Sequence, residues 1–461
     1  MYKYDPKSSI ADEFINDAEI LESLAYAREN KANKQVIDAI LQKAREMKGI
    51  SHKEAAVLLE CELEEENKEI EKLAKEIKER FYGKRIVMFA PLYLSNYCIN
   101  SCVYCPYHVK NKHIARKKLS QEEIKQEVIA LQDMGHKRLA IEAGEDPENN
   151  PLEYILESIR TIYSIKHKNG AIRRVNVNIA ATSVENYKKL KDAGIGTYIL
   201  FQETYNKEAY KELHPAGPKS DYAYHTEAMD RAMEAGIDDV GCGVLFGLDK
   251  YRYELVGIIM HAEHLEAKFG VGPHTISVPR VCPADDIDPE ELNAIPDEIF
   301  EKIVSVIRIA VPYTGMIVST RESKATREKV LDLGISQISG GSRTSVGGYV
   351  EEEPEEQTIF EVVENMPDFP GGQAALMQYL AKNIKYPTIA QENGTQGRVI
   401  VQFVVNRDGS IVDAKVVRSV DPYLDKEALR VINTMPKWKP GMQRGKPVRV
   451  KFTVPVMFRL Q

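Results

Sequence analysis

The strongest constraint on the fold is an alternation of short β-branched runs with longer helical patterns, which extends from about Lys84 to about Ser342. Eight runs are strand candidates: RIVMFAPL, KRLAIEAG, RRVNVNIA, GTYILFQE, DVGCGVLFG, HTISVPR, GMIVST and ISQISGG. Between them lie helical patterns such as SQEEIKQEVIALQDMG, in which Ser120 is a predicted N-cap and Gly135 a predicted stop. Strands that alternate with helices indicate a parallel sheet with crossover helices. Over roughly 260 residues we expect an α/β fold closed as a (β/α)8 barrel, with an open doubly wound sheet as the alternative.

This alternation divides the chain into segments of different character. Residues 1–83 are predicted to form a helical extension, whose run ELEEENKEIEKLAKEIKER is typical of an amphipathic helix with one solvated face. The barrel is expected over 84–348, and an exposed acidic linker over 349–357. Residues 358–461 are predicted to be a separate small α+β domain. In this last segment two alternating strands flank Asp408-Gly409, a strong hairpin signal, and PVRVKFTVPVMF is a final strand.

Composition narrows the class of protein. The 461 residues carry a formal net charge of -7, which argues against a nucleic-acid partner. No run approaches the roughly 18 apolar residues of a membrane-spanning helix. The N-terminal sequence MYKYDPKSSIADEF lacks the apolar core of a signal peptide. We therefore expect a cytoplasmic protein without a membrane span.

Three cysteines lie close together in YLSNYCINSCVYCPYH, after the first predicted strand. The spacing Cys98-x3-Cys102-x2-Cys105 places three thiolates on one loop, with the aromatic Tyr104 beside the third. A [4Fe–4S] cluster usually takes four thiolates, so three leave one iron open to a small molecule. The alternatives are a zinc site with His108 as the fourth ligand, or three unrelated core cysteines. The other cysteines are scattered: Cys61, Cys242 and Cys282.

The cysteine motif resembles that of the radical S-adenosylmethionine (SAM) superfamily, and EAGEDP after the second strand strengthens the resemblance. In that superfamily a Gly-Glu pair at this place meets the amino group of SAM, and here the pair is Gly144 and Glu145. The resemblance implies that the amino and carboxylate groups of SAM bind the open iron. It also implies that one electron from the cluster cleaves the sulfonium to a 5′-deoxyadenosyl radical, which abstracts hydrogen from a substrate.

Within this superfamily, residues 1–350 resemble the tyrosine lyases of [FeFe]-hydrogenase maturation, the HydG family. The matching stretches are APLYLSNYCINSCVYCPYH, RLAIEAGEDPENNP, LFQETYNKEAYKELHPAGPKSDY, GVGPHTISVPR and QISGGSRTSVGGY. The resemblance implies cleavage of L-tyrosine at Cα–Cβ to p-cresol and dehydroglycine, which this branch converts to carbon monoxide and cyanide. It also implies an electron donor such as flavodoxin or ferredoxin. A more distant resemblance is to 2-iminoacetate synthase of thiamine thiazole synthesis, which is the alternative function.

Polar residues that close barrel strands are candidates for SAM binding. Asn178 closes the third strand, Gln202 and Glu203 the fourth, and Arg280 the sixth. We expect them to hydrogen-bond the ribose or carboxylate of SAM, with plain packing at the barrel rim as the alternative.

Two arginines and three histidines complete the candidates. The carboxylate of tyrosine favours a fork-shaped guanidinium partner, and Arg321 after strand seven is preferred over Arg343 after strand eight. The family resemblance suggests that His274, at the start of strand six, helps to hold the extra iron of an auxiliary cluster. A hydrogen-bonded core histidine is the alternative. His261 and His264 are expected on a solvated helix face.

The C-terminal segment departs from the HydG pattern. That family carries a second Cys-x2-Cys…Cys set, which binds an auxiliary cluster. The last cysteine here is Cys282, so this second set is absent from the sequence. We therefore predict tyrosine cleavage, and we do not predict formation of carbon monoxide and cyanide. Residues 358–461 instead resemble the C-terminal domain of TonB, especially at Tyr386-Pro387 and Trp438-Lys439-Pro440. Such domains bind an extended partner segment at a sheet edge. We therefore expect a fusion protein. The second alternative function is partner binding of the TonB type, in which the barrel would have no part.

Overall fold

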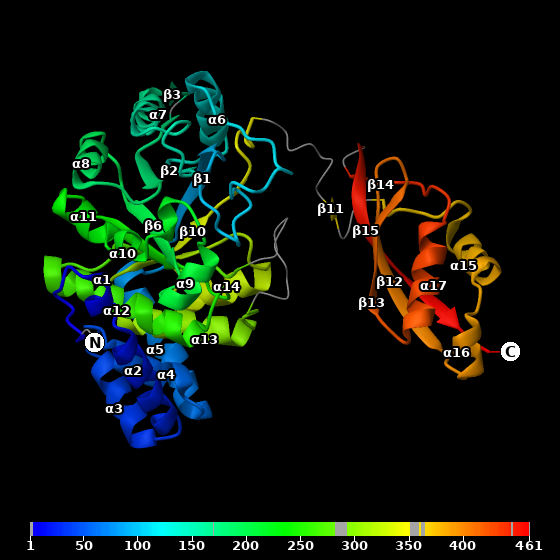
Figure 1. Ribbon diagram of the computed structural model, residues 1–461, viewed down its shortest axis with the longest axis horizontal. Coiled ribbons are helices and arrows are strands. Elements are labelled where there is room, and N and C mark those ends of the chain that lie inside the picture. Colours follow the sequence, from blue (N-terminus) through cyan, green and yellow to red (C-terminus); the bar gives the residue numbers. More distant parts are fainter. Residues whose placement is uncertain are drawn as a thin grey trace. The chain divides into compact units, whose positions relative to one another are not determined.

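Eight parallel strands close into a barrel in the first of the two compact units of the chain, Met1–Val350 and Glu351–Gln461 (Figure 1). The computed structural model describes residues 3–168, 170–281, 293–350, 359–360, 365–443 and 446–460. The strand order around the barrel is β1-β10-β9-β8-β7-β6-β5-β2. The strands are β1 (Val87–Ser95), β2 (Arg138–Ala143), β5 (Arg174–Asn178), β6 (Tyr198–Glu203), β7 (Val240–Val244), β8 (Thr275–Ser277), β9 (Gly315–Val318) and β10 (Gln337–Ser339). They are the eight predicted runs, so the predicted (β/α)8 barrel is confirmed and the open sheet is not.

Helices connect successive strands on the outside of the barrel. Ser120 caps α6 through a capping box with Glu123, and Gly135 follows the helix with a φ of 95°, a conformation that glycine adopts without strain. The helices are α6 (Gln121–Asp133), α7 (Leu152–Ser164), α8 (Val184–Asp192), α9 (Lys207–Leu213), α10 (Tyr222–Thr226), α11 (Ala228–Glu234), α12 (Tyr251–Phe269), α13 (Asp297–Ala310) and α14 (Lys324–Leu333), with the 3-10 turn η1 (Pro218–Ser220). A small hairpin of β3 (Lys166–His167) and β4 (Gly170–Ala171) follows α7.

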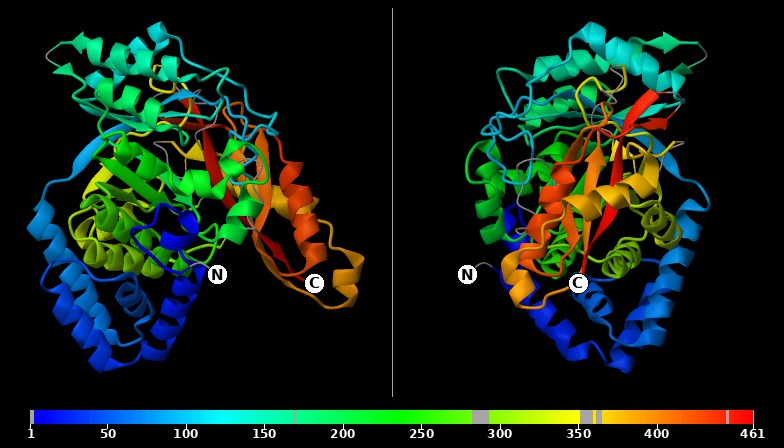
Figure 2. Two further views of the ribbon diagram at one scale, coloured as in Figure 1. Left: turned by 60° about the vertical axis from the view of Figure 1, so that its left-hand side comes forward. Right: turned by 90° about the vertical axis from the view of Figure 1, so that its right-hand side faces the viewer.

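The N-terminal helices form a further layer outside α12 and α13. They are α1 (Ala11–Phe14), α2 (Asp17–Asn30), α3 (Lys34–Ala44), α4 (His52–Glu60) and α5 (Glu64–Tyr82). Helices α2 and α4 contact α12, and α5 contacts α13. Both views in Figure 2 show α2 to α5, in blue, together on one side of the barrel. Helix α5 buries Ile70, Leu73 and Ile77 and leaves its charged face to solvent, as its amphipathic sequence predicts.

This layer overturns the expectation for His261 and His264, which are 3% and 0% exposed rather than solvated. The ring of Phe14 stacks on His264 at 3.7 Å between centroids, and the Nε2 of His264 lies 2.9 Å from Asp230 Oδ2. The Nδ1 of His261 lies 2.8 Å from the hydroxyl of Tyr205. The spacing alone could not predict this burial, because the covering residues are more than 200 positions earlier in the chain.

The second unit is a small α+β domain. Its sheet has the order β11-β15-β12-β13, with β14 paired to β15. Its elements are β11 (Ile359–Phe360), α15 (Gly372–Asn383), α16 (Thr388–Glu392), β12 (Gly397–Val405), β13 (Ile411–Arg418), α17 (Pro422–Asn433), β14 (Gly441–Gln443) and β15 (Lys446–Phe458). Gly409 turns the predicted hairpin with a φ of 80°, and a Cβ there would lie 1.9 Å from the carbonyl oxygen of Trp438. The Trp438 ring then packs against Phe403 and Phe452 in the core.

No helix in the described parts of the chain has both the length and the apolar character that a membrane crossing requires.

A buried histidine joins the N-terminal layer to the barrel. The Nδ1 of His52 lies 2.7 Å from Glu263 Oε2 on α12, and its Nε2 lies 3.1 Å from Glu19 Oε1 on α2. Tyr4 donates its hydroxyl to the same Glu263 oxygen at 3.0 Å. Burial lowers the pKa of His52, but the two carboxylates outweigh it and raise the pKa above its ordinary value of 6.5.

We predict that His52 stabilises the fold most at low pH. A raised folded-state pKa contributes stability that is complete below 6.5 and is lost as the pH rises through the folded value. Replacing His52 with Gln should destabilise the protein by about 1–3 kcal/mol at pH 6, and by less at pH 9. Urea unfolding at the two pH values measures the difference, with His113→Gln as a control at an exposed histidine. An equal loss of stability at both pH values would contradict the prediction.

Candidate functional site

The three cysteines lie on the loop between β1 and α6, at the carboxyl end of the first barrel strand (Figure 1). Cys102 is buried, while Cys98 and Cys105 are half-buried. Burial raises the pKa of Cys102 to about 12 and that of Cys105 to about 11, and the charges of neighbouring thiols act in the same direction. The three sulfur atoms are therefore close enough to repel one another as thiolates. The positive charge of a bound cation or of the irons of a cluster offsets such repulsion. A thiol that coordinates the metal is then deprotonated outright.

Among the residues that the structure describes, no three His, Cys, Asp or Glu side chains converge as ligands of a single metal ion. The three cysteines fit a [4Fe–4S] cluster differently, because in a cluster each thiolate binds its own iron.

Asn100, inside the cysteine motif, links the loop to its surroundings. Its side-chain amide donates to Glu145 Oε2 at 2.6 Å and lies 3.8 Å from the sulfur of Cys98. Its side-chain oxygen accepts the backbone N–H of Lys219 at 2.9 Å. A Cβ at Gly217 would lie 2.4 Å from that oxygen, so only glycine allows this approach. One side chain thus orients the loop, Glu145 and the Lys219 segment together.

The predicted Gly144-Glu145 pair lies directly against the cysteine loop. A Cβ at Gly144 would lie 2.3 Å from the carbonyl oxygen of Tyr97 and 2.9 Å from the Cβ of Cys98. The carbonyl of Glu145 accepts the N–H of Ile99 at 2.9 Å. Burial raises the pKa of Glu145, and its hydrogen bond from Asn100 opposes that rise. The half-buried carboxylate therefore stands beside the thiols, where it can accept a hydrogen bond from an ammonium group.

Tyr104 has a buried partner in His214. Its hydroxyl lies 2.7 Å from His214 Nε2, and the other ring nitrogen of His214 lies 2.8 Å from the carbonyl of Tyr210. Burial lowers the pKa of His214 to about 3, so the imidazole stays neutral. Tyr104 therefore acts here as a support of the cysteine loop, and its predicted contact with cofactor remains a prediction.

Asn178, Gln202 and Glu203 all close strands at the barrel mouth, as predicted. Gln202 is buried and donates to Thr226 Oγ1 at 3.0 Å, while Asn178 is half-buried. Glu203 has a φ of 67°, an unusual conformation for a non-glycine residue, and its carboxylate pairs with Lys219 Nζ at 2.8 Å. Their contacts with SAM remain predictions.

Lys219 is a site residue that the sequence did not reveal. Burial lowers its pKa, but the charges of Glu203, Cys102 and Cys105 outweigh burial and raise it, so the ammonium stays charged. It is the cation that faces both the thiols and Glu203. Its position on the η1 turn, more than 100 residues after the cysteines, gave no local signal.

A second group of polar residues faces the inside of the barrel at the same mouth. Phe89 and Ala140 lie on the neighbouring strands β1 and β2, whereas Ile317 lies on β9, which β10 separates from β1. The three side chains form one cluster, so they point into the barrel. Side chains alternate along a strand, which places Tyr93 and Glu142 on the same inner face, nearer the mouth. These two residues are register partners on β1 and β2, and Glu142 is also in register with Asn178 on β5.

Glu142 is the unusual member of this group. Burial raises its pKa to about 7, and Tyr93 and the guanidinium of Arg321 limit the rise. Arg321 is exposed, and its side chain donates a long hydrogen bond, 3.4 Å, to Ser319 Oγ. A carboxyl group and a guanidinium therefore face the same space at the barrel mouth. The sequence reasoning selected Arg321 and missed Glu142.

Three further predicted residues interact with other parts of the protein. Arg280 pairs with Asp297 at 2.8 Å and with Glu322, and Arg343 donates to the carbonyl of Gly348 at 2.7 Å. His274 precedes β8, so it lies at the amino end of the barrel, opposite the cysteine loop. Its Nδ1 is 3.3 Å from Asp239 Oδ1. Arg280 and Arg343 follow the carboxyl ends of β8 and β10, at the same mouth as the cysteine loop, whereas His274 lies at the opposite end. The predicted roles of these three residues remain predictions.

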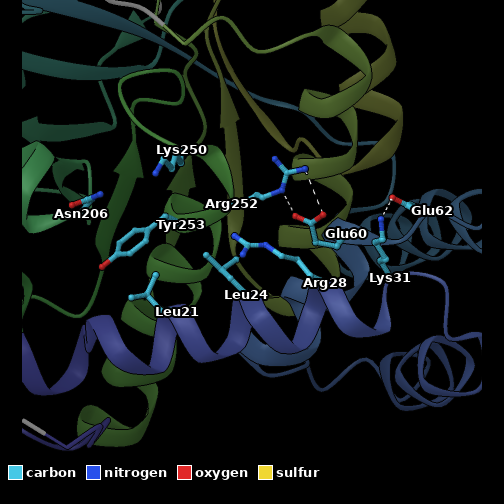
Figure 3. A pocket seen from close by; sticks show the side chains of 10 residues that line it. All are labelled: Leu21, Leu24, Arg28, Lys31, Glu60, Glu62, Asn206, Lys250, Arg252 and Tyr253. Atoms are coloured by element: carbon cyan, nitrogen blue, oxygen red, sulfur yellow. Dashed lines mark hydrogen bonds and ion pairs between the residues drawn. The ribbon is translucent and has the colours of Figure 1, made fainter.

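A cavity of about 640 Å³ lies apart from this group, between the N-terminal helices and the start of α12 (Figure 3). Arg252 pairs with Glu60 there, and Lys31 with Glu62 at 2.6 Å. None of the predicted site residues lines it.

Comparison with known proteins identifies the class. Residues 92–260 match the family model of the radical SAM superfamily, and residues 277–380 match that of the biotin and thiamin synthesis associated domain. Residues 382–460 match the model of the Gram-negative bacterial TonB protein C-terminal domain.

Comparison with individual relatives shows which members of the superfamily the chain resembles. A crystal structure of HydG, a maturase of the [FeFe]-hydrogenase, is 60% identical, with a TM-score of 0.72 over 74% of this chain and 75% of that one. HydG from Carboxydothermus hydrogenoformans is 44% identical, with a TM-score of 0.69 over 74% and 78%. The 2-iminoacetate synthase of Salmonella typhimurium is 30% identical over 61% of this chain and 73% of its own length.

The chain belongs to the radical SAM superfamily, whose cofactors are a [4Fe–4S] cluster and SAM. Within it, the barrel unit is of the family that contains HydG and 2-iminoacetate synthase, and the C-terminal unit is a TonB C-terminal domain.

We predict that Asn100 controls SAM binding through Glu145. In Asn100→Asp a carboxylate would replace the amide donor 2.6 Å from the Glu145 oxygen. Loss of a hydrogen bond to a charged group should weaken SAM binding about 10-fold to 100-fold while the cluster still assembles. Equilibrium dialysis of SAM with the reconstituted protein measures this, together with its iron content. Asn33→Asp, at an exposed helix N-cap, is the matched control. Unchanged SAM affinity in Asn100→Asp would contradict this role.

Proposed function

We propose that this protein is a radical SAM lyase that cleaves L-tyrosine at the Cα–Cβ bond, giving p-cresol and dehydroglycine. The observation that carries the proposal is a carboxyl group and a guanidinium at the barrel mouth, Glu142 and Arg321, on the same end as the cysteine loop. Free tyrosine is a zwitterion, so it offers a carboxylate to one group and an ammonium to the other. The 60% identity to HydG supports the same substrate.

The residues of the chain would divide the work as follows. Cys98, Cys102 and Cys105 would hold the cluster, and Glu145 would accept a hydrogen bond from the amino group of SAM. When bound, the cluster and SAM supply the one-electron chemistry that produces a hydrogen-abstracting radical. Arg321 would hold the tyrosine carboxylate and Glu142 its ammonium. The barrel wall would exclude water from the reacting atoms.

The biological role that we propose is maturation of an [FeFe]-hydrogenase in the cytoplasm, with a flavodoxin or ferredoxin as electron donor. Thiamine synthesis is the second candidate, and the 30% identity to 2-iminoacetate synthase, against 60% to HydG, makes it the weaker one. We propose dehydroglycine as the final product, without conversion to carbon monoxide and cyanide, because the six cysteines of the sequence include no second Cys-x2-Cys…Cys set.

The C-terminal unit favours an additional role in binding. Strand β15 pairs along β12 from Val450 to Phe458. On its other side, the described residues of β11 pair with Arg449 and Val450, and β14 pairs with Lys446, Pro447 and Val448. The remainder of that side, residues 451–458, pairs with no strand in the described part of this unit and offers backbone groups to an extended segment. We propose that this edge binds a peptide strand of a partner protein.

The main test is anaerobic reconstitution followed by iron counting and product analysis. The proposal predicts about four irons per chain, and release of 5′-deoxyadenosine and p-cresol from SAM plus tyrosine. Serine in place of Cys102 should abolish both products. A chain that binds no iron, or that forms neither product, would leave only the binding role.

The roles of Glu142 and Arg321 can be tested with analogues of tyrosine that lack either the amino group or the carboxylate. Glu142→Gln should reduce the preference for tyrosine over 3-(4-hydroxyphenyl)propionate, which has no amino group, by about 10-fold. Arg321→Met should likewise reduce the preference over tyramine, which has no carboxylate. Equilibrium binding to the reconstituted protein measures both ratios.

Arg343→Met is the matched control, because Arg343 was the other candidate for the carboxylate. If Arg343→Met loses the preference over tyramine and Arg321→Met keeps it, the two assignments must be exchanged.

A further inference from the structure

One surface beside the cysteine loop differs in charge from the chain as a whole. Residues 106–118, PYHVKNKHIARKK, follow the third cysteine directly and contain no acidic residue in a chain of net charge -7. Their cations are Lys110, Lys112, Arg116, Lys117 and Lys118. This segment connects the cysteine motif to α6 (Figure 1, cyan).

The segment is held in a fixed shape by its own side chains. The guanidinium of Arg116 donates to the carbonyl groups of Asn96, Tyr107, His108 and Asn111, at 2.6–3.2 Å. The backbone N–H of Val109 donates to the carbonyl of Asn100 at 2.8 Å, which ties the segment to the cysteine motif. The surface is therefore built before any partner arrives, and a partner would lose little entropy in ordering it.

Two apolar side chains and two cations are exposed in this segment and in the cysteine motif next to it. Val103, between the second and third cysteines, is 41% exposed, and Val109 is 47% exposed. Lys110 and Lys112 are exposed, and no carboxylate among the described residues pairs with them. Arg116 and Lys118 instead donate to carbonyl groups, and Lys117 also has an interaction partner. Lys110 and Lys112 are therefore the available cations of the segment.

We propose that Val103, Val109, Lys110 and Lys112 form the docking surface for an acidic one-electron carrier protein, either a flavodoxin or a ferredoxin. The inference rests on the proposed function, because only a redox cluster at the three cysteines needs such a partner. Charge complementarity selects the partner: a basic patch steers an acidic protein and repels a basic one. The valines give the centre of the contact an apolar surface that excludes water. The electron then has a short path, since Val103 is adjacent in sequence to Cys102.

The test measures how fast the reconstituted full-length protein is reduced by two donors. One donor is reduced flavodoxin, and the other is reduced methyl viologen, a small cation that needs no docking surface. Lys110→Glu/Lys112→Glu should slow reduction by flavodoxin about 10-fold or more at low salt, and added salt should shrink the difference. Reduction by methyl viologen should not slow, because loss of positive charge cannot repel a cation.

Two further variants make the result specific. Lys188→Glu/Lys191→Glu carries the same charge change on α8, and it should leave the flavodoxin rate within about 2-fold of the unaltered protein. Val109→Ser should slow reduction by flavodoxin with no change in net charge. If flavodoxin reduces the Lys110→Glu/Lys112→Glu variant as fast as the unaltered protein, the docking surface is wrong. If methyl viologen reduces no cluster in the unaltered protein, the proposed function itself fails.

Discussion

The closed parallel barrel is the constraint on which the site depends. All eight strands run in one direction, so their carboxyl ends meet at one mouth and the loops that follow them share one space. This convergence brings together the cysteine loop after β1, Glu145 after β2 and Glu203 at the end of β6. Asn100 then fixes the loop against its neighbours with two hydrogen bonds. Without the barrel, three cysteines at this spacing would be a flexible ligand set without a substrate site.

Charge is distributed at the mouth in two separate groups. Around the cysteines, Lys219 and Glu203 form a half-buried ion pair, and the ammonium also faces the thiols. On the inner face of the barrel mouth, Glu142 feels the charge of Arg321, and we assign the space beside them to the substrate. The Lys219–Glu203 pair combines both signs of charge, which limits the electrostatic cost of burying it. We propose that this separation allows one mouth to bind SAM at the first group and the amino-acid substrate at the second.

The sequence predicted the features that depend on local pattern. The eight strands, the α6 cap at Ser120 and the Gly409 turn follow from periodicity and backbone chemistry, and the structure has each of them. The residues that were missed depend on contacts between distant segments. Lys219 reaches the cysteines only because Gly217 packs against Asn100, and His264 is buried only because Phe14 covers it. Glu142 had a local signal, because strand alternation places it two residues after the inward-facing Ala140.

The most direct measurement of the central claim is electron paramagnetic resonance of the reduced protein, recorded with and without SAM. The account predicts one reduced [4Fe–4S] signal that changes when SAM is added, because the iron without a cysteine ligand is where SAM binds. The signal should be lost in Cys102→Ser. A cluster signal that SAM does not alter, or one that persists in Cys102→Ser, would contradict the assignment of this loop as the cofactor site.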